Sequence, residues 1–581
     1  MNCPSRTDEP PKHDGLNQNP PGLAGDLTTR QDLNGIVNTR TDQDFSTIPN
    51  DPKSQQAVEK VEAGEKIIST THQTGIEGAD DDGSPPSSND PPSRRSPVLP
   101  TMLTALSAIR KYAKFIGPGF MVAVAYIDPG NYSTDVAAGA TTRFRHLFII
   151  LMSNLFAILL QTLAVRLGSV TGMNLAENCR AHLPKWLNIF LYILGEAAII
   201  ATDIAEVIGS AIALNLLLNI PLVAGCAITL IDVLIILLFY NPDGNMRRLR
   251  AFEYFVMALV LGVVICFCIE LSLIEDTSVG EVFKGYLPSS AVVNGQGIYL
   301  SCGILGATVM PHSLYLGSGI VQARLKDYES RSGITHAMKR ESLDSEKLYY
   351  KPSFAAIRSC MKYSITEVAV SLFTFALFVN SAILIVAGAS LSNNSAAESA
   401  DLFGIHDLLK RTIAPVAGTI FALALLLSGT SAGIVCTIAG QMLSEGALNW
   451  KLAPWLRRLV TRAISITPSI IIAASIGKEG LSAALNASQV ALSVALPFVS
   501  APLIYFTSRN RFMVVGGASR GGRDNDSTSA AEEDGEAEGR EGGAGRKMSN
   551  HWLISVLGCV IWLVMVIMNV ALLVLVGLGK A

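Results

Sequence analysis

Residues 125–135 read AYIDPGNYSTD and place an aspartate, a proline, a glycine and an asparagine inside an apolar stretch that runs from about residue 115 to residue 140. Such a stretch is either a turn between two short segments or a break within one membrane span. A turn would leave residues 115–127 too short, because a bilayer core of about 30 Å requires roughly 20 apolar residues in a helix. We therefore interpret the stretch as a break inside a single span.

The composition places the chain among polytopic membrane proteins. Hydrophobic residues make up 49% of the 581 residues and charged residues 16%, and the mean hydropathy is +0.38. The net charge of -3 gives no indication of nucleic-acid binding. The nine cysteines show neither CxxC pairs nor zinc-ligand spacing, so we expect no disulfide framework.

Eleven apolar runs are long enough to cross a membrane. They lie near residues 115–140, 147–165, 187–213, 221–240, 252–274, 297–321, 363–388, 413–438, 459–477, 484–507 and 551–579. Basic residues gather in the loops after the even-numbered runs, for example Arg180, Arg247, Arg324 and Arg457. Because basic loops favour the cytoplasmic side, we expect a cytoplasmic N-terminus and an external C-terminus.

A second break lies five spans after the first. Residues 303–321, GILGATVMPHSLYLGSGIV, carry Pro311 in the middle of the sixth apolar run, as Pro129 and Gly130 stand in the first. Spans five apart cross the membrane in opposite senses, as expected for two inverted five-helix repeats. Broken helices at matching positions of such repeats indicate a transport site at the midplane. We favour this interpretation over a structural kink, because freed backbone groups at membrane depth need a cavity or a protein contact.

The residues at the two breaks favour a divalent transition metal. Asp128 and Asn131 offer hard oxygen ligands, to which backbone carbonyls near Ala125 and Ala307 could add. Met310 offers a thioether, from which Mg²⁺ and Ca²⁺ gain little but which Mn²⁺, Fe²⁺, Co²⁺ and Cd²⁺ tolerate. Most membrane methionines pack, but this one stands directly before the helix-breaking proline of the partner span.

Ionisable residues in the third span indicate a route for protons. Glu196, Asp203 and Glu206 stand at i, i+7 and i+10, which a helix places on one stripe. The stripe is either a proton relay or a buried polar network that fixes helix packing. Arg462 in the ninth run either pairs with the stripe or snorkels toward the cytoplasm. His312 either titrates near neutral pH or orients the broken helix as a neutral hydrogen-bonding residue.

Four motifs in order resemble the Nramp (natural resistance-associated macrophage protein) family of proton-coupled divalent metal transporters. They are DPGN in the first span, TDIAEVIGSAIALNLL in the third, MPH in the sixth and AGQMLSEG after the eighth. The resemblance covers roughly residues 110–515. The long polar N-terminus and MPHSLYLGS, in place of the commoner MPHN, are most like the fungal manganese transporters of the family. The resemblance to this family implies an all-α polytopic membrane protein with 11 transmembrane helices and a LeuT-like inverted 5+5 repeat with broken helices 1 and 6.

The resemblance also implies roles for single residues. The metal ligands would be the side chains of Asp128, Asn131 and Met310, the carbonyls of Ala125 and Ala307 and, in one conformation, Gln489. Asp203 and Glu206 would form the proton route, with His312 near its start. The chain departs from the family at Ala495, where a second glutamine is usual, and at GTSA from Gly429, where GQSS is usual. These departures bear on selectivity rather than on transport.

We therefore expect proton-coupled import of Mn²⁺, and also of Fe²⁺, Co²⁺ or Cd²⁺, into the cytosol by alternating access. The metal is then the substrate, and we expect neither a cofactor nor enzymatic chemistry. One alternative is a sodium-coupled organic-solute symporter of the same architecture, and another is a metal-sensing receptor that does not transport. The absence of HExxH and GxGD motifs counts against a membrane protease. The plasma membrane and an endosomal or vacuolar membrane are both compatible with the sequence.

Two polar segments lie outside the spans, one before the first span and one between the tenth and the eleventh. We expect a disordered cytoplasmic N-terminal tail (1–105), a transporter core (106–515), a disordered acidic cytoplasmic linker (516–549) and an eleventh transmembrane helix (550–581), because the polar segments cannot bury enough apolar surface to fold. The tail lacks the apolar region of a cleavable signal peptide, so the first span would direct insertion. Its lysines, Lys12, Lys53, Lys60 and Lys66, are candidate sites for ubiquitin-ligase adaptors, and Asn393 is a candidate glycosylation site.

Overall fold

The computed structural model describes residues 117–240, 246–275, 277–333, 350–392, 401–448, 454–515 and 546–578. The predicted disordered tail with its four lysines, the sequon at Asn393 and most of the acidic linker lie outside these ranges.

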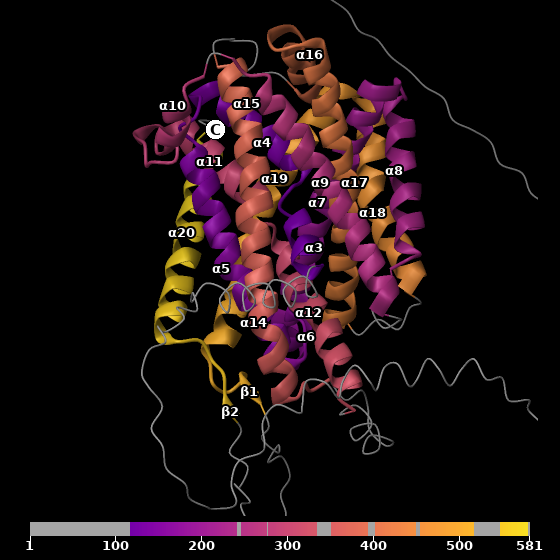
Figure 1. Ribbon diagram of the computed structural model, residues 1–581, viewed down its shortest axis with the longest axis vertical. Coiled ribbons are helices and arrows are strands. Elements are labelled where there is room, and N and C mark those ends of the chain that lie inside the picture. The colour runs from indigo at the N-terminus through magenta and orange to yellow at the C-terminus, as the bar shows by residue number, and fades with distance from the viewer. Residues whose placement is uncertain are drawn as a thin grey trace, which may run out of the picture. The chain divides into compact units, whose positions relative to one another are not determined.

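Helices make up nearly all of this part of the chain (Figure 1). The continuous long helices are α5 (Leu147–Thr171), α7 (Lys185–Leu218), α8 (Leu222–Leu237), α9 (Met246–Ser272), α17 (Pro415–Leu448), α18 (Pro454–Ser475), α19 (Lys478–Ser508) and α20 (Trp552–Gly577). Shorter elements are α6 (Leu175–His182), α10 (Val279–Lys284), the 3-10 turn η1 (Ser290–Val292), α16 (Leu402–Thr412) and the strands β1 (Val514–Val515) and β2 (Arg546–Lys547).

The helices occupy all eleven predicted ranges. The seventh range holds α14 (Phe354–Ser371), a π-helical turn η2 (Leu372–Ala376) and α15 (Leu377–Ser390). Within the described residues, eight helical segments are long and apolar enough to cross a membrane, and α8 and part of α18 are shorter apolar helices. The number of eleven crossings therefore stays a prediction.

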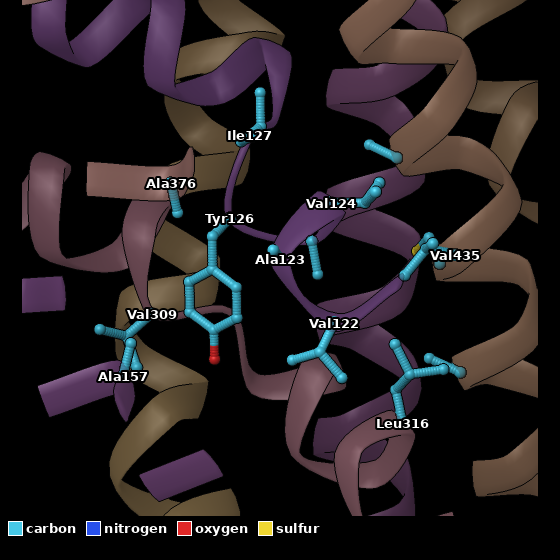
Figure 2. Close-up of a cluster of buried hydrophobic side chains, with 14 of the residues drawn as sticks. Val122, Ala123, Val124, Tyr126, Ile127, Ala157, Val309, Leu316, Ala376 and Val435 are labelled. Atoms are coloured by element: carbon cyan, nitrogen blue, oxygen red, sulfur yellow. The ribbon is translucent and has the colours of Figure 1, made fainter. Parts of the chain in front are cut away.

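The first predicted break divides α3 (Pro118–Val124) from α4 (Pro129–Thr142). Figure 2 shows the chain leaving the helical path at Tyr126 and Ile127. Asp128 is extended, with φ -110° and ψ 149°, and caps α4. Pro129 begins α4, where its missing N–H leaves no hydrogen bond unmade. The break is thus a helix stop followed directly by a capped helix start.

The second predicted break divides α11 (Gly295–Thr308) from α12 (Pro311–Arg331). Met310 is extended, with φ -76° and ψ 123°, and Pro311 begins α12 as Pro129 begins α4. Both breaks were predicted from the same residue type, and both are confirmed.

The broken helices lie in the interior of the helical assembly. Tyr126, Val309 and Ala376 belong to one buried apolar cluster (Figure 2). Glycines permit the close contacts: a Cβ atom at Gly139 of α4 would stand 2.6 Å from the carbonyl oxygen of Leu384 in α15. The unwound segments are therefore enclosed by protein, which satisfies the condition for irregular backbone at membrane depth.

The chain after α19 forms a small hairpin before α20 begins. β1 pairs antiparallel with β2, and Arg166 of α5 donates hydrogen bonds to the carbonyls of Met548 (3.1 Å) and Ser549 (3.2 Å). Residues 546–549, which fall in the predicted linker, thus join the helical core. Figure 1 shows the two strands below the lower end of α20.

Candidate metal site

Asp128 presents a carboxylate to the interior at the first break. One oxygen, Oδ2, accepts a hydrogen bond of 2.8 Å from the backbone N–H of Gly130. The other oxygen, Oδ1, is buried and has no hydrogen-bond partner in the described part of the chain. Buried carboxylate oxygens are normally paired, because losing water without a new partner is costly. Oδ1 is therefore available to a ligand.

Two asparagines converge on one backbone carbonyl of the unwound segment. The side-chain amides of Asn131 and Asn380 donate to the carbonyl of Tyr126 at 3.0 and 3.1 Å. The Oδ1 atoms of both asparagines are buried and lack partners among the described residues. Ser428 of α17 donates to the next carbonyl, that of Ile127, at 2.7 Å. Side chains from three helices thus hold the segment and leave two amide oxygens unused.

Met310 lies at the second break and contacts the third predicted span. It packs with Ala198 and Ala201 of α7 in a buried cluster that also holds Ala495. The hydroxyl of Thr202 lies 3.9 Å from the Met310 sulfur and 3.3 Å from His312 Nδ1. A sulfur atom in this position is shielded from lipid by the helices around it.

Gln489 of α19 lies between the two breaks. A Cβ atom at Gly130 would overlap the Gln489 side-chain amide, and one at Gly306 of α11 would stand 2.8 Å from the Gln489 carbonyl. The side-chain Oε1 is buried without a partner in the described residues. Ala125 and Ala307 are buried at the ends of α3 and α11 that face the breaks. The structure thus brings the predicted ligand residues to the ends of α3, α4, α11 and α12 and to the interior of α19.

Arg462 joins the carboxylates of the third predicted span. Its guanidinium donates to Asp203 and, at 3.3 Å, to Glu206, and the three side chains are buried. Arg462 therefore pairs with the stripe and does not snorkel. Glu196, two helical turns earlier, is only half-buried, and its Oε2 has no hydrogen-bond partner among the described residues.

Cys436 lies beside this ion pair, and one ligand atom from each of Asp203, Glu206 and Cys436 falls within 4.8 Å of the others. Three such atoms could in principle hold a metal. Arg462 already binds both carboxylates, however, and a metal cation there would meet a buried positive charge. We therefore place the candidate metal site at the helix breaks.

The metal-site candidate and the ion pair are neighbours. The Pro129 ring packs against Gly209 of α7, one helical turn beyond Glu206. Asp128 also lies close enough to Asp203 for the two carboxylates to repel each other. A charge at one site is consequently felt at the other.

A polar network below the first break was not predicted. Gln161 of α5 donates hydrogen bonds of 2.9 Å to the Tyr126 hydroxyl and to Ser313 of α12, and Tyr126 and Ser313 lie 2.9 Å apart. The network ties both broken helices to α5. The sequence feature that could have indicated this network is Gln161, a glutamine within the apolar run 147–165.

A second polar network was not predicted, and it corrects the predicted position of Arg324. Arg324, which the loop pattern placed in a basic loop, lies buried within α12 and forms an ion pair of 3.2 Å with Glu253 of α9. The hydropathy pattern ended the sixth span at residue 321, whereas α12 continues to Arg331.

Glu367 of α14 accepts hydrogen bonds from the backbone N–H groups of Gly117 and Gly119 at 2.6 and 3.0 Å. The sequence features that could have indicated these contacts are Glu253 in the apolar run 252–274 and Glu367 in the apolar run 363–388.

Known proteins of one family are similar to this chain in sequence and fold. A family model described as natural resistance-associated macrophage protein-like matches residues 119–519. The manganese transporter SMF1 of Saccharomyces cerevisiae is 52% identical over 81% of this chain and 86% of its own length. The iron transporter SMF3 of the same yeast is 53% identical over 71% and 85%. A crystal structure of a variant of the Eremococcus coleocola manganese transporter has a TM-score of 0.62 and 31% identity, covering 78% and 85%.

Proposed function

The chain belongs to the Nramp family, and we propose that it imports Mn²⁺, and also Fe²⁺, Co²⁺ or Cd²⁺, into the cytosol together with protons. Family membership makes the chain an integral multi-pass membrane protein of a metal-transporter family, and the predicted all-α fold with two broken helices is confirmed. The choice of metal, the coupling to protons and the site residues are the proposal.

The convergence of unpaired ligand atoms at the two breaks carries this proposal. Asp128 and Asn131 each keep one oxygen without a hydrogen-bond partner in the described part of the chain, and Met310 lies at the opposite break. Two hard oxygens with one soft sulfur suit Mn²⁺ or Fe²⁺ better than Mg²⁺ or Ca²⁺, which gain little from a thioether. The manganese and iron transporters among the relatives support the same choice.

The proposed transport cycle begins with the metal at the first break. The ion loses water and gains the oxygens of Asp128 and Asn131, the Met310 sulfur and the carbonyls of Ala125 and Ala307. Gln489 lies against Gly130 and joins the ligands in one conformation. Movement of the helices around the breaks then opens the site to the cytosol.

We propose that protons follow α7. A divalent cation at Asp128 disfavours a proton on that carboxylate, and Asp203 lies within electrostatic reach. The Asp203 and Glu206 carboxylates share Arg462, so a change of charge at Asp128 alters the balance of their ion pair. Glu196 lies two helical turns before Asp203 on α7 and completes the inward route. His312 lies beside the start of the route, with Nδ1 near Thr202.

Purified full-length protein in liposomes tests the proposal. A trapped dye quenched by Mn²⁺ and a second dye that reports pH should show metal entry that an acidic exterior accelerates. Asp128→Ala should abolish entry. Asp407→Ala provides a matched control, because this carboxylate is 63% exposed on α16. Mn²⁺ binding without entry would instead favour the metal-sensing receptor, and sodium-driven uptake of an organic solute would favour the symporter.

We also propose that the N-terminus faces the cytosol, as the positions of the loop cations suggest. A protease added to intact cells should leave an N-terminal epitope whole and should remove it only after the membrane is permeabilised. Fluorescence microscopy of the tagged protein distinguishes the plasma membrane from an endosomal or vacuolar membrane.

A further inference from the structure

α20 contacts the rest of the protein mainly through α19 and α11 and leaves two apolar cavities along its contact with α19. They have volumes of about 540 and 620 Å³. Ala501, Tyr505 and Trp562 line both cavities and separate them. Trp562 is held in place, because its indole N–H donates to the carbonyl of Pro497 at 2.8 Å. The two cavities thus flank a fixed aromatic divider.

The larger cavity, which we call the α19–α20 crease, is apolar along most of its length and polar at one end. Ile504, Val556, Val560 and Leu563 form the apolar wall. Ser508, Arg509 and Ser555 lie at the end where α19 finishes and α20 begins. The Arg509 guanidinium lies 5.7 Å from the centre of the Tyr505 ring. An apolar slot that ends at a cation matches an amphiphile with one negative end.

Further basic residues lie near Arg509 in the described part of the chain. Arg511, Arg546 and Lys547 are exposed on the adjoining hairpin, and residues 505–515 and 546–560 contain no aspartate or glutamate. None of these four cations forms an ion pair with the described part of the chain. Trp552, which is 64% exposed at the start of α20, is a residue type typical of the level of lipid headgroups. The polar end of the crease therefore lies where headgroup phosphates are found.

We propose that the α19–α20 crease binds an anionic glycerophospholipid. The phosphate lies at Arg509 and Ser508, and one acyl chain lies along Val556, Val560 and Leu563. Basic residues near a membrane surface attract anionic headgroups at roughly 1 kcal/mol each, which corresponds to about a fivefold preference. A sterol has no anionic group for Arg509, and free phosphate has no chain for the apolar wall. The bound lipid fills the joint through which α20 attaches to the core.

Native mass spectrometry of the detergent-purified full chain tests this inference. Dioleoyl phosphatidylserine should bind several-fold better than dioleoyl phosphatidylcholine, and Arg509→Gln should remove that preference. Arg145→Gln is the matched control, because this exposed arginine follows α4, at the end of α5 opposite the one that meets the hairpin. It should leave the preference unchanged.

A steric pair of variants tests the apolar wall separately. Val560→Trp fills the crease and should reduce binding of phosphatidylserine, whereas Ile567→Trp, on a lipid-facing surface that lines neither cavity, should not. Equal binding of the two phospholipids to the wild type, or an unchanged preference in Arg509→Gln, would overturn the inference. Displacement of phosphatidylserine by ergosterol or by inorganic phosphate would also overturn it.

Discussion

The carboxylate of Glu367 accepts a hydrogen bond of 2.6 Å from the backbone N–H of Gly117, directly before the first broken helix. The same oxygen accepts from Gly119 at 3.0 Å, so one side chain on α14 holds two of the free donors at the start of α3. α3 is a seven-residue helix whose N-cap residue, Gly117, has no side chain that could cap the helix. Its position consequently depends on a residue that lies about 250 positions later in the chain.

Replacing Glu367 should loosen α3 without unfolding the protein. Glu367→Ala removes a buried acceptor for two N–H groups, and hydrogen bonds to charged groups contribute roughly 1.5–3 kcal/mol. Hydrogen-exchange mass spectrometry should show about tenfold or faster exchange in residues 117–127, since local opening controls exchange. Glu281→Ala, which removes a half-exposed ion pair with Arg143, should leave these residues unchanged. Protection of residues 117–127 equal to wild type would show that the carboxylate does not hold α3.

The Met310 sulfur should decide the discrimination against Ca²⁺. In Met310→Ala the site keeps its oxygen ligands but loses the soft ligand, so Ca²⁺ should compete with Mn²⁺ for uptake into liposomes. The loss of buried volume also costs roughly 2–5 kcal/mol, and a control must reproduce this cost. Met565→Ala, equally buried in α20, supplies it. If both variants discriminate as the wild type does, the thioether is not the selector.

Arg462 should matter for stability as well as for protons. Arg462→Leu leaves Asp203 and Glu206 buried without their common partner, and breaking a buried ion pair costs roughly 3–5 kcal/mol. The melting temperature should fall markedly. Arg331→Ala breaks an exposed pair with Asp327 and should change stability by at most about 1 kcal/mol.

A compensated variant separates the two roles of Arg462. Combining Arg462→Leu with Asp203→Asn and Glu206→Gln removes all three charges and should recover much of the lost stability. Proton entry with Mn²⁺ should remain lost. Recovery of coupled proton entry in the triple variant would exclude this network from the proton route.

The sequence predicts the local events of this fold better than its long-range contacts. Pro129 and Pro311 each begin a helix directly after an unwound segment, and a proline within an apolar run favours such a break, so both breaks could be predicted from residue type and hydropathy. The contacts of Gln161 with Tyr126 and Ser313, and those of Glu367 with Gly117, join helices far apart in the chain. No periodic pattern within one span specifies such partners.

Arg324 shows where hydropathy misleads. A buried arginine with a carboxylate partner is compatible with a helix interior, but an arginine lowers the local count of apolar residues, and this count ended the sixth span before Arg324. Hydropathy likewise left two alternatives open for Arg462, because it does not show whether a buried carboxylate lies beside the arginine. Choosing between them required the position of α18 against α7, which only the folded chain supplies.

Gly130 and Gln489 should behave as a coupled pair. A Cβ atom at Gly130 would overlap the Gln489 side-chain amide, and the helical position of Gly130 in α4 otherwise accepts alanine. Gly130→Ala should therefore lower the melting temperature, and Gln489→Ala in the same chain should restore much of it by removing the amide. Contacting residues typically show coupling free energies of roughly 0.5–3 kcal/mol in such cycles. Gly280→Ala, whose Cβ atom would stand 3.7 Å from its nearest neighbour, is the control. Additive effects of the two substitutions on the melting temperature would place Gln489 away from the first break and would remove it from the proposed ligand set.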